Sequence, residues 1–177
     1  MKPQHLYNIN SILDDDIVIK KIFPVPADAH CRFLATHRTY SYYIYQHKNP
    51  FLKDKAWFYP FPLDIDLLNK AAAILHENDD FTSFSKRNTQ VHTKLCKIIK
   101  STWEIKDDQY IYTVKANRFL RGMIRGLVGT MLHVGRGKIS LNDLHSIIEE
   151  KNCNNADFSA PAHGLFLMEV GYPSKIM

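Results

Sequence analysis

LCKIIKSTWEIKDDQYIYTVKA, Leu95 to Ala116, is the stretch that decides the fold class of this chain. Two β-rich runs, Leu95 to Lys106 and Gln109 to Ala116, flank the pair Asp107-Asp108. Such runs joined by two turn-forming residues are typical of a β-hairpin. Because so short a connection joins only antiparallel strands, the sequence predicts a long antiparallel hairpin.

Further strands are expected on both sides of this hairpin. Arg38 to His47 (RTYSYYIYQH) is rich in tyrosine and predicts a long strand, and Leu165 to Val170 predicts a closing strand. Ile17 to Phe23 (IVIKKIF) is also β-rich and is expected to form a strand. Successive side chains alternate along a strand, so Tyr40 and Tyr42 should share one face of the sheet.

Three segments predict helices. Asp64 can cap a helix that runs to about Glu77, and Ser140 can cap a last helix. The third helix is expected from Phe119 to Gly137. Mixed strands and helices with an antiparallel hairpin favour one α+β domain over residues 1–177, with helices on one face of a mainly antiparallel sheet. The other face would then be open to a ligand.

The segment FLRGMIRGLVGTMLHVGRG, Phe119 to Gly137, predicts a helix with two unlike sides. One side carries a broad apolar arc. The other carries three arginines with three glycines beside them: Arg118, Arg121, Arg125, Gly122, Gly126 and Gly129. Glycine destabilises a helix interior by about 1 kcal/mol, so its repetition needs a reason. Tight helix packing is one explanation, and close approach of a flat or anionic ligand is the other.

Composition limits the classes of function. The chain has 177 residues, 45% of them hydrophobic and 23% charged, and a formal net charge of +5. A basic balance favours a polyanionic partner. There is no apolar run long enough to cross a bilayer. The three cysteines are widely spaced, which favours a reducing cytoplasm over a disulfide framework. Neither cysteine nor histidine spacing suggests a metal site, and no cofactor is implied.

Three other motifs are ambiguous when each is taken alone. Tyr40 and Tyr42 could stack on a nucleobase, although cross-strand packing in a core is the commoner use of such a pair. DFTSF, Asp80 to Phe84, is typical of a turn with two core phenylalanines. APAHGL, Ala160 to Leu165, predicts a loop that leads into a strand.

Together these motifs resemble the TruA family of tRNA pseudouridine synthases. The resemblance runs from about Asn10 to Pro173, and four motifs occur in the family's order. They are AHCRFLATHRTYSYYI (29–44), DFTSF (80–84), FLRGMIRGLVGTMLHVGRG (119–137) and APAHGLFLMEVGYP (160–173). The resemblance implies the pseudouridine synthase fold, of ferredoxin or RRM-like type, and an isomerase that acts on uridines of the tRNA anticodon stem-loop without a cofactor.

The resemblance also implies roles for individual residues. Tyr40 matches the active-site tyrosine that packs on the target base, and Arg125 matches the arginine that pairs with the catalytic aspartate. Leu165 matches the leucine that lines the uracil pocket. Arg118 and Arg121 lie at more variable positions of the arginine motif, and we infer that they bind substrate. The family also implies a homodimer in the cytoplasm.

One family feature does not occur in this sequence. Family members carry Gly-Arg-Thr-Asp-x-Gly, whose aspartate is catalytic, and no such motif occurs among these 177 residues. The chain therefore resembles a C-terminal half, which we expect to be inactive alone. Arg125 should then be exposed, paired elsewhere or ready to bind phosphate, because an unpaired buried guanidinium is costly. A non-catalytic tRNA-binding module and an orphan half that needs a separate N-terminal half are the alternatives.

Overall fold

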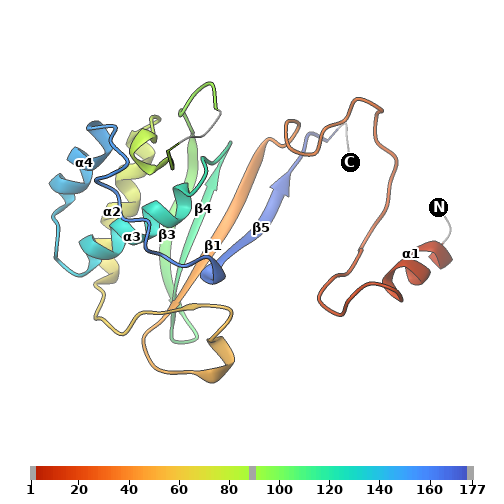
Figure 1. Ribbon diagram of the computed structural model, residues 1–177, viewed down its shortest axis with the longest axis horizontal. Coiled ribbons are helices and arrows are strands. Elements are labelled where there is room, and N and C mark those ends of the chain that lie inside the picture. Colours follow the sequence, from red (N-terminus) through yellow and green to blue (C-terminus); the bar gives the residue numbers. More distant parts are fainter. Residues whose placement is uncertain (1–2, 88–90, 175–177) are drawn as a thin grey trace. The chain divides into compact units, whose positions relative to one another are not determined.

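A mainly antiparallel sheet forms the centre of the compact unit made by residues 36–171 (Figure 1). The computed structural model describes residues 3–87 and 91–174. The strands run in the spatial order β2-β1-β4-β3, and β5 pairs with β1. Of the pairings between these described strands, only the short β1–β2 pairing is parallel. Their bounds are β1 His37–Tyr45, β2 Trp57–Phe58, β3 Ile98–Lys106, β4 Gln109–Ala116 and β5 Leu165–Gly171.

The hairpin expected from the sequence is confirmed. β3 and β4 pair antiparallel, with Lys106 opposite Gln109 at the turn. Asp107 and Asp108 have φ angles of 51° and 57°. A two-residue turn with positive φ at both central positions is type I′, whose twist matches that of the two strands it joins. Aspartate tolerates this left-handed conformation better than most residues, which explains the Asp-Asp pair.

Three helices of this unit, α2 Ile65–Ile74, α3 Met123–Gly135 and α4 Leu141–Glu149, lie on one side of the sheet (Figure 1). The caps predicted for α2 and α4 are confirmed. The Asp64 side chain accepts hydrogen bonds from the backbone at the start of α2, and Ser140 forms a reciprocal capping box with Asp143 on α4. The described residues also form 3₁₀ turns, at η1 Pro50–Leu52, η2 Leu75–Glu77, η3 Thr82–Phe84 and η4 Ala162–Gly164.

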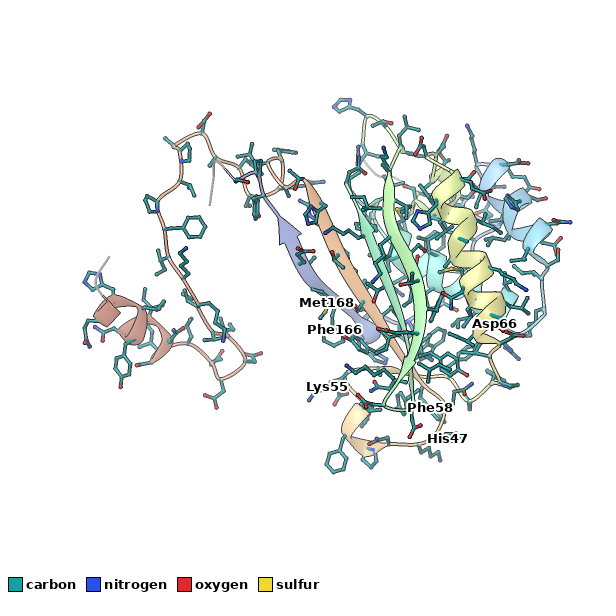
Figure 2. All side chains as sticks on the ribbon, turned by 180° about the vertical axis from the view of Figure 1, so that it is seen from behind. His47, Lys55, Phe58, Asp66, Phe166 and Met168 are labelled. Carbon is teal, nitrogen blue, oxygen red and sulfur yellow. The ribbon has the colours of Figure 1, made fainter. Side chains whose placement is uncertain are left out.

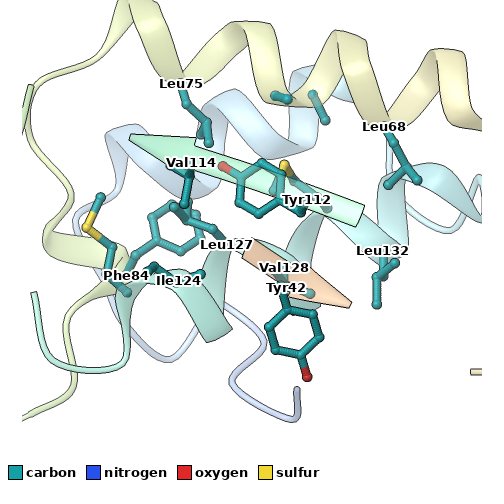
Figure 3. Close-up of a cluster of buried hydrophobic side chains, with 14 of the residues drawn as sticks. Tyr42, Leu68, Leu75, Phe84, Tyr112, Val114, Ile124, Leu127, Val128 and Leu132 are labelled. Carbon is teal, nitrogen blue, oxygen red and sulfur yellow. The ribbon is translucent and has the colours of Figure 1, made fainter. Parts of the chain in front are cut away.

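The hydrophobic core lies between these helices and the sheet (Figure 3). Tyr42 and Tyr112 enter it from neighbouring strands, and both are fully buried. Leu127 and Val128 enter it from α3, and Leu68 enters it from α2. The α+β class, with helices on one face of a mainly antiparallel sheet, therefore agrees with the expectation from the sequence.

Among the described residues, 3–35 and 172–174 form a second compact unit, whose helix α1 covers Pro3–Asn10. The strand expected at Ile17 to Phe23 is wrong, because these residues pair with no strand. Within this segment the backbone N–H and C=O of Ile19 bond to the side chain of Asn10, at 2.8 and 3.0 Å. A β-rich sequence forms a strand only beside a partner strand. The single domain expected over residues 1–177 stays a prediction.

The arginine segment also differs from expectation at its start. Helix α3 begins at Met123, because Gly122 has a φ of +80° and interrupts the helical backbone. Arg118 and Arg121 therefore precede the helix, and the predicted stripe of three arginines on one helix is wrong. Gly126 and Gly129 are inside α3, where an added Cβ would meet Phe158 and Asp157 respectively. Close packing thus explains these two glycines.

Candidate active site

Arg125 lies in the first turns of α3, and its guanidinium reaches the chain that leads into β5. The Nε atom donates to the carbonyl of Ala160, and Nη2 lies 3.4 Å from the carbonyl oxygen of Phe158. The side chain is half-buried. Of the three states expected for this arginine, the structure shows pairing elsewhere, with backbone carbonyls in place of a carboxylate.

Tyr42 holds the same stretch of chain from the sheet side. Its hydroxyl donates a hydrogen bond of 2.7 Å to the carbonyl of Pro161. Burial raises the pKa of Tyr42, and the positive charge of Arg125 acts in the opposite direction. Gly164 lies against the Tyr42 ring, where an added Cβ would stand 3.0 Å from two ring carbons. The loop motif APAHGL is therefore clamped between α3 and β1.

Tyr40 lies on β1, two residues from Tyr42 and on the same face of the sheet. Its ring meets that of Phe119 edge-on, with the centroids 5.1 Å apart. This contact joins the tyrosine motif to the arginine motif. Tyr40 is half-buried and packs against the core. The candidate site is thus on the helix-bearing side, whereas the sequence suggested that a ligand would use the open side.

Leu165 is the first residue of β5 and lies opposite Tyr42 of β1 in the antiparallel register. It is partly buried and packs against the core. Because directly opposed residues share a face, Leu165 projects to the same side of the sheet as Tyr40 and Tyr42. Tyr40, Arg125 and Leu165 therefore all lie around Tyr42.

A polar network that sequence reasoning missed supports this loop. The Asp157 carboxylate lies 3.1 Å from Nε2 of His133, and its backbone N–H donates to Thr130 at 3.0 Å. Thr130 and His133 are three residues apart on α3, which places them on one helix face. Ser159 also donates to Asp157. The spacing on α3 was a possible signal, but nothing in the sequence indicated Asp157 as the partner.

The DFTSF motif forms a turn with two core phenylalanines, as its residue pattern favoured. Phe81 and Phe84 are fully buried. The Asp80 carboxylate accepts from the backbone and side chain of Thr82 and lies 2.9 Å from Nζ of Lys151. Burial raises the pKa of Asp80, but the hydrogen bonds from Lys151 and Thr82 outweigh it and lower this pKa below its ordinary value.

Arg118 and Arg121 lie on the segment between β4 and α3. Arg121 is exposed and Arg118 is half-buried. Burial raises the pKa of the Cys96 thiol to about 11, and the positive charge of Arg118 opposes this shift. Neither arginine forms an ion pair within residues 3–87 and 91–174.

No group of three or more His, Cys, Asp or Glu side chains could hold a metal ion in the described part of the chain. Among its helices, none has the length and apolar character needed to cross a membrane.

Comparison with known proteins gives one consistent result. A family model described as tRNA pseudouridine synthase matches residues 71–173. The tRNA pseudouridine synthase A of Bacteroides fragilis is 46% identical over 169 residues, which are 95% of this chain and 67% of that protein. The protein of the same name from Porphyromonas gingivalis is 45% identical over 170 residues, or 95% and 68% of the two chains. The one from Staphylococcus aureus strain JH1 is 36% identical over 169 residues, or 94% and 63%.

Proposed function

This chain belongs to the tRNA pseudouridine synthase family, and from that membership we propose that Tyr40, Arg125 and Leu165 form part of its uridine pocket. The activity is the conversion of uridine to pseudouridine in tRNA, an isomerisation. The bond between uracil N1 and ribose C1′ breaks, the base turns, and a bond forms between C5 and C1′. The hydrogen on C5 leaves as a proton and N1 gains one, so the reaction needs no redox partner.

The observation that carries this proposal is the meeting of motifs that lie far apart in the sequence. Tyr40 contacts Phe119, and Arg125 binds the carbonyls of Phe158 and Ala160. Lys86, which follows DFTSF, donates its backbone N–H to the carbonyl of Arg121 at 3.0 Å. The four motifs of the family resemblance thus lie next to one another.

We assign Arg125 the role of holding a catalytic carboxylate. A guanidinium has five N–H donors, and the two described contacts use two of them. The remaining donors suit a carboxylate, which such a pair keeps ionised and oriented. The carbonyls of Phe158 and Ala160 then fix the plane of the guanidinium before a carboxylate arrives.

Tyr40 and Leu165 act on the base in this proposal. Tyr40 stacks on the extruded uracil and assists the final proton transfer. Leu165 excludes water while the glycosidic bond is broken. The Tyr40 ring is held edge-on by Phe119, which limits how it can turn and so favours one stacking plane.

The carboxylate itself comes from a segment with the motif Gly-Arg-Thr-Asp-x-Gly in this proposal. The edge of β5 offers a place for that segment. β5 pairs with β1, and no strand pairs along its other edge in the described residues. Phe166 and Met168 are exposed on this strand (Figure 2). An unpaired edge with exposed apolar side chains favours the addition of another strand.

The finer parts of the assignment are proposals as well. We propose that the target uridines lie in the anticodon stem-loop, that the enzyme works in the cytoplasm, and that it is a homodimer. The state of the cysteines supports a reducing compartment, because Cys31, Cys96 and Cys153 are all free thiols. Size-exclusion chromatography with light scattering tests the dimer.

Tritium release from tRNA labelled at C5 of uridine tests the function. The 177-residue chain alone should release none, because it lacks a catalytic carboxylate. The chain fused behind a segment that carries the motif Gly-Arg-Thr-Asp-x-Gly should release tritium. The same fusion with the aspartate of Gly-Arg-Thr-Asp-x-Gly changed to alanine is the matched control and should be silent.

Two results would contradict the proposal. Release by the chain alone would remove the need for a supplied carboxylate. A folded fusion that binds tRNA but releases no tritium would favour the alternative of a non-catalytic tRNA-binding module.

A further inference from the structure

A backbone hydrogen bond brings Lys86 and Arg121 together at the turn before α3, outside the proposed uridine pocket, and each has a second basic residue close to it in the sequence. This basic cluster consists of Lys86, Arg87, Arg118 and Arg121. Lys86, Arg87 and Arg121 are exposed, and Arg118 is half-buried. Arg118 and Arg121 belong to the arginine motif, whereas Lys86 and Arg87 lie near that motif only in the folded chain.

Lys86 is held against the turn that precedes α3 by two separate features. Its backbone N–H donates to the carbonyl of Arg121 at 3.0 Å. Its side-chain methylenes lie over Gly122, where an added Cβ would stand 2.9 Å from Cγ of Lys86. The bare Cα of Gly122 thus makes room for the stem of Lys86, while the ammonium group stays exposed.

Arg87 is ordered by a third segment of the chain. Its Nη2 donates to the side-chain oxygen of Asn154 at 2.7 Å. Asn154 is neutral, so the contact orients the guanidinium without cancelling its charge. The planar guanidinium retains donors that match the oxygens of a phosphate group.

The charge of the basic cluster is not balanced by nearby acids. None of its members forms an ion pair in the described parts of the chain, residues 3–87 and 91–174. The charge of Asp80 raises the pKa of the Cys96 thiol, whereas that of Arg118 lowers it. The Asp80 carboxylate is itself paired with Lys151. The first turn of α3 has no acidic residue and no side-chain cap, so the positive end of its dipole adds to the same field.

We propose that the basic cluster binds the phosphate backbone of the RNA substrate, with Lys86 and Arg121 on neighbouring phosphates. This inference rests on the proposed function and adds a contact surface for the nucleotides that flank the target uridine. Arginine and lysine contacts to phosphates position a nucleic acid and carry no base specificity. The cluster would therefore hold the strand in register while the pocket takes the base.

The test is the salt dependence of binding between the purified chain and an unmodified tRNA transcript. Fluorescence anisotropy gives the dissociation constant between about 50 and 200 mM salt, where each phosphate contact contributes to the slope of log K against log salt. Lys86→Gln and Arg121→Gln should each reduce this slope by about 1, and the double variant by about 2. Arg121→Lys keeps the charge and should keep the slope.

Lys138→Gln is the matched control, because Lys138 is an exposed lysine beyond the other end of α3. It should bind as the unchanged chain does. Far-UV circular dichroism confirms that each variant is folded. If the unchanged chain binds tRNA and the double variant has the same slope, the inference is overturned and the proposed function stands. If the unchanged chain does not bind tRNA at low salt, the inference is overturned, whereas the proposed function is decided separately by tritium release from the fusion.

Discussion

The hydroxyl of Tyr42 lies 2.7 Å from the carbonyl oxygen of Pro161 and donates a hydrogen bond to it. This bond ties the middle of β1 to the loop that leads into β5, and Arg125 binds the same loop from α3. The fully buried Tyr42 therefore connects the sheet to the candidate site.

Tyr42→Phe should destabilise the chain by about 1–3 kcal/mol, because it leaves the Pro161 carbonyl without its donor. Urea unfolding followed by circular dichroism measures this loss. Tyr43→Phe is the control, since the Tyr43 ring contacts Phe166 on the other face of the sheet. An equal effect of the two substitutions would contradict the importance of the bond.

Gly129→Ala should destabilise the chain by about 1–3 kcal/mol through overpacking. The added Cβ would collide with the Asp157 backbone carbonyl, and the helix and loop would have to separate. Thermal unfolding measures the effect. Gly126→Ala should cost less, because its Cβ would meet only the Phe158 ring, which can turn. The reverse order would show that the loop yields more readily than the ring.

Arg125→Lys should reduce tritium release by the active fusion by more than about tenfold, with a smaller effect on tRNA binding. Lysine keeps the charge but cannot reach two carbonyls and a carboxylate with one planar group. Single-turnover release and anisotropy separate the two effects. A variant that releases tritium at the original rate would exclude a bidentate role for Arg125.

The ionised Asp80 carboxylate should stabilise the folded chain, so the free energy of unfolding should fall as the pH is lowered. The pKa of Asp80 is lowered in the folded chain, so its contribution is present above the unfolded pKa of about 3.9 and is lost as pH falls below it. Melting temperatures between about pH 5 and pH 2 follow this loss. Asp80→Asn should flatten the profile, and an unchanged profile would contradict the assignment.

Arg118→Ala should weaken tRNA binding and flatten its dependence on salt. Arg118 is half-buried, so the substitution also tests whether the stability of the region around Cys96 depends on the Arg118 side chain. Binding is measured by anisotropy, and melting temperature is the control for folding. Unchanged binding by a folded variant would remove Arg118 from the proposed RNA contacts.

Local chemistry made much of the fold predictable. The Asp107-Asp108 turn, the Asp64 cap and the Ser140 capping box each depend on residues only a few positions apart, and each is confirmed. The family motifs also lie in the sequence itself, and they pointed to the pseudouridine synthase family that the comparisons identify.

Local patterns failed where the outcome depended on distant contacts. Ile17 to Phe23 has strand composition but no partner strand. Helical periodicity extended across Gly122, but the left-handed φ of Gly122 keeps α3 from starting before Met123. No sequence pattern indicated that Lys86 would lie over Gly122, because only folding brings these two residues together.

The sequence by itself determined the family, because side-chain type and motif order need no coordinates. Only the tertiary structure decided what the residues of the motifs touch. Arg125 is held by the carbonyls of Phe158 and Ala160, and Gly126 and Gly129 make room for that loop. The reason is physical: backbone carbonyls are present at every residue, so no pattern marks the few that packing brings within reach of a guanidinium.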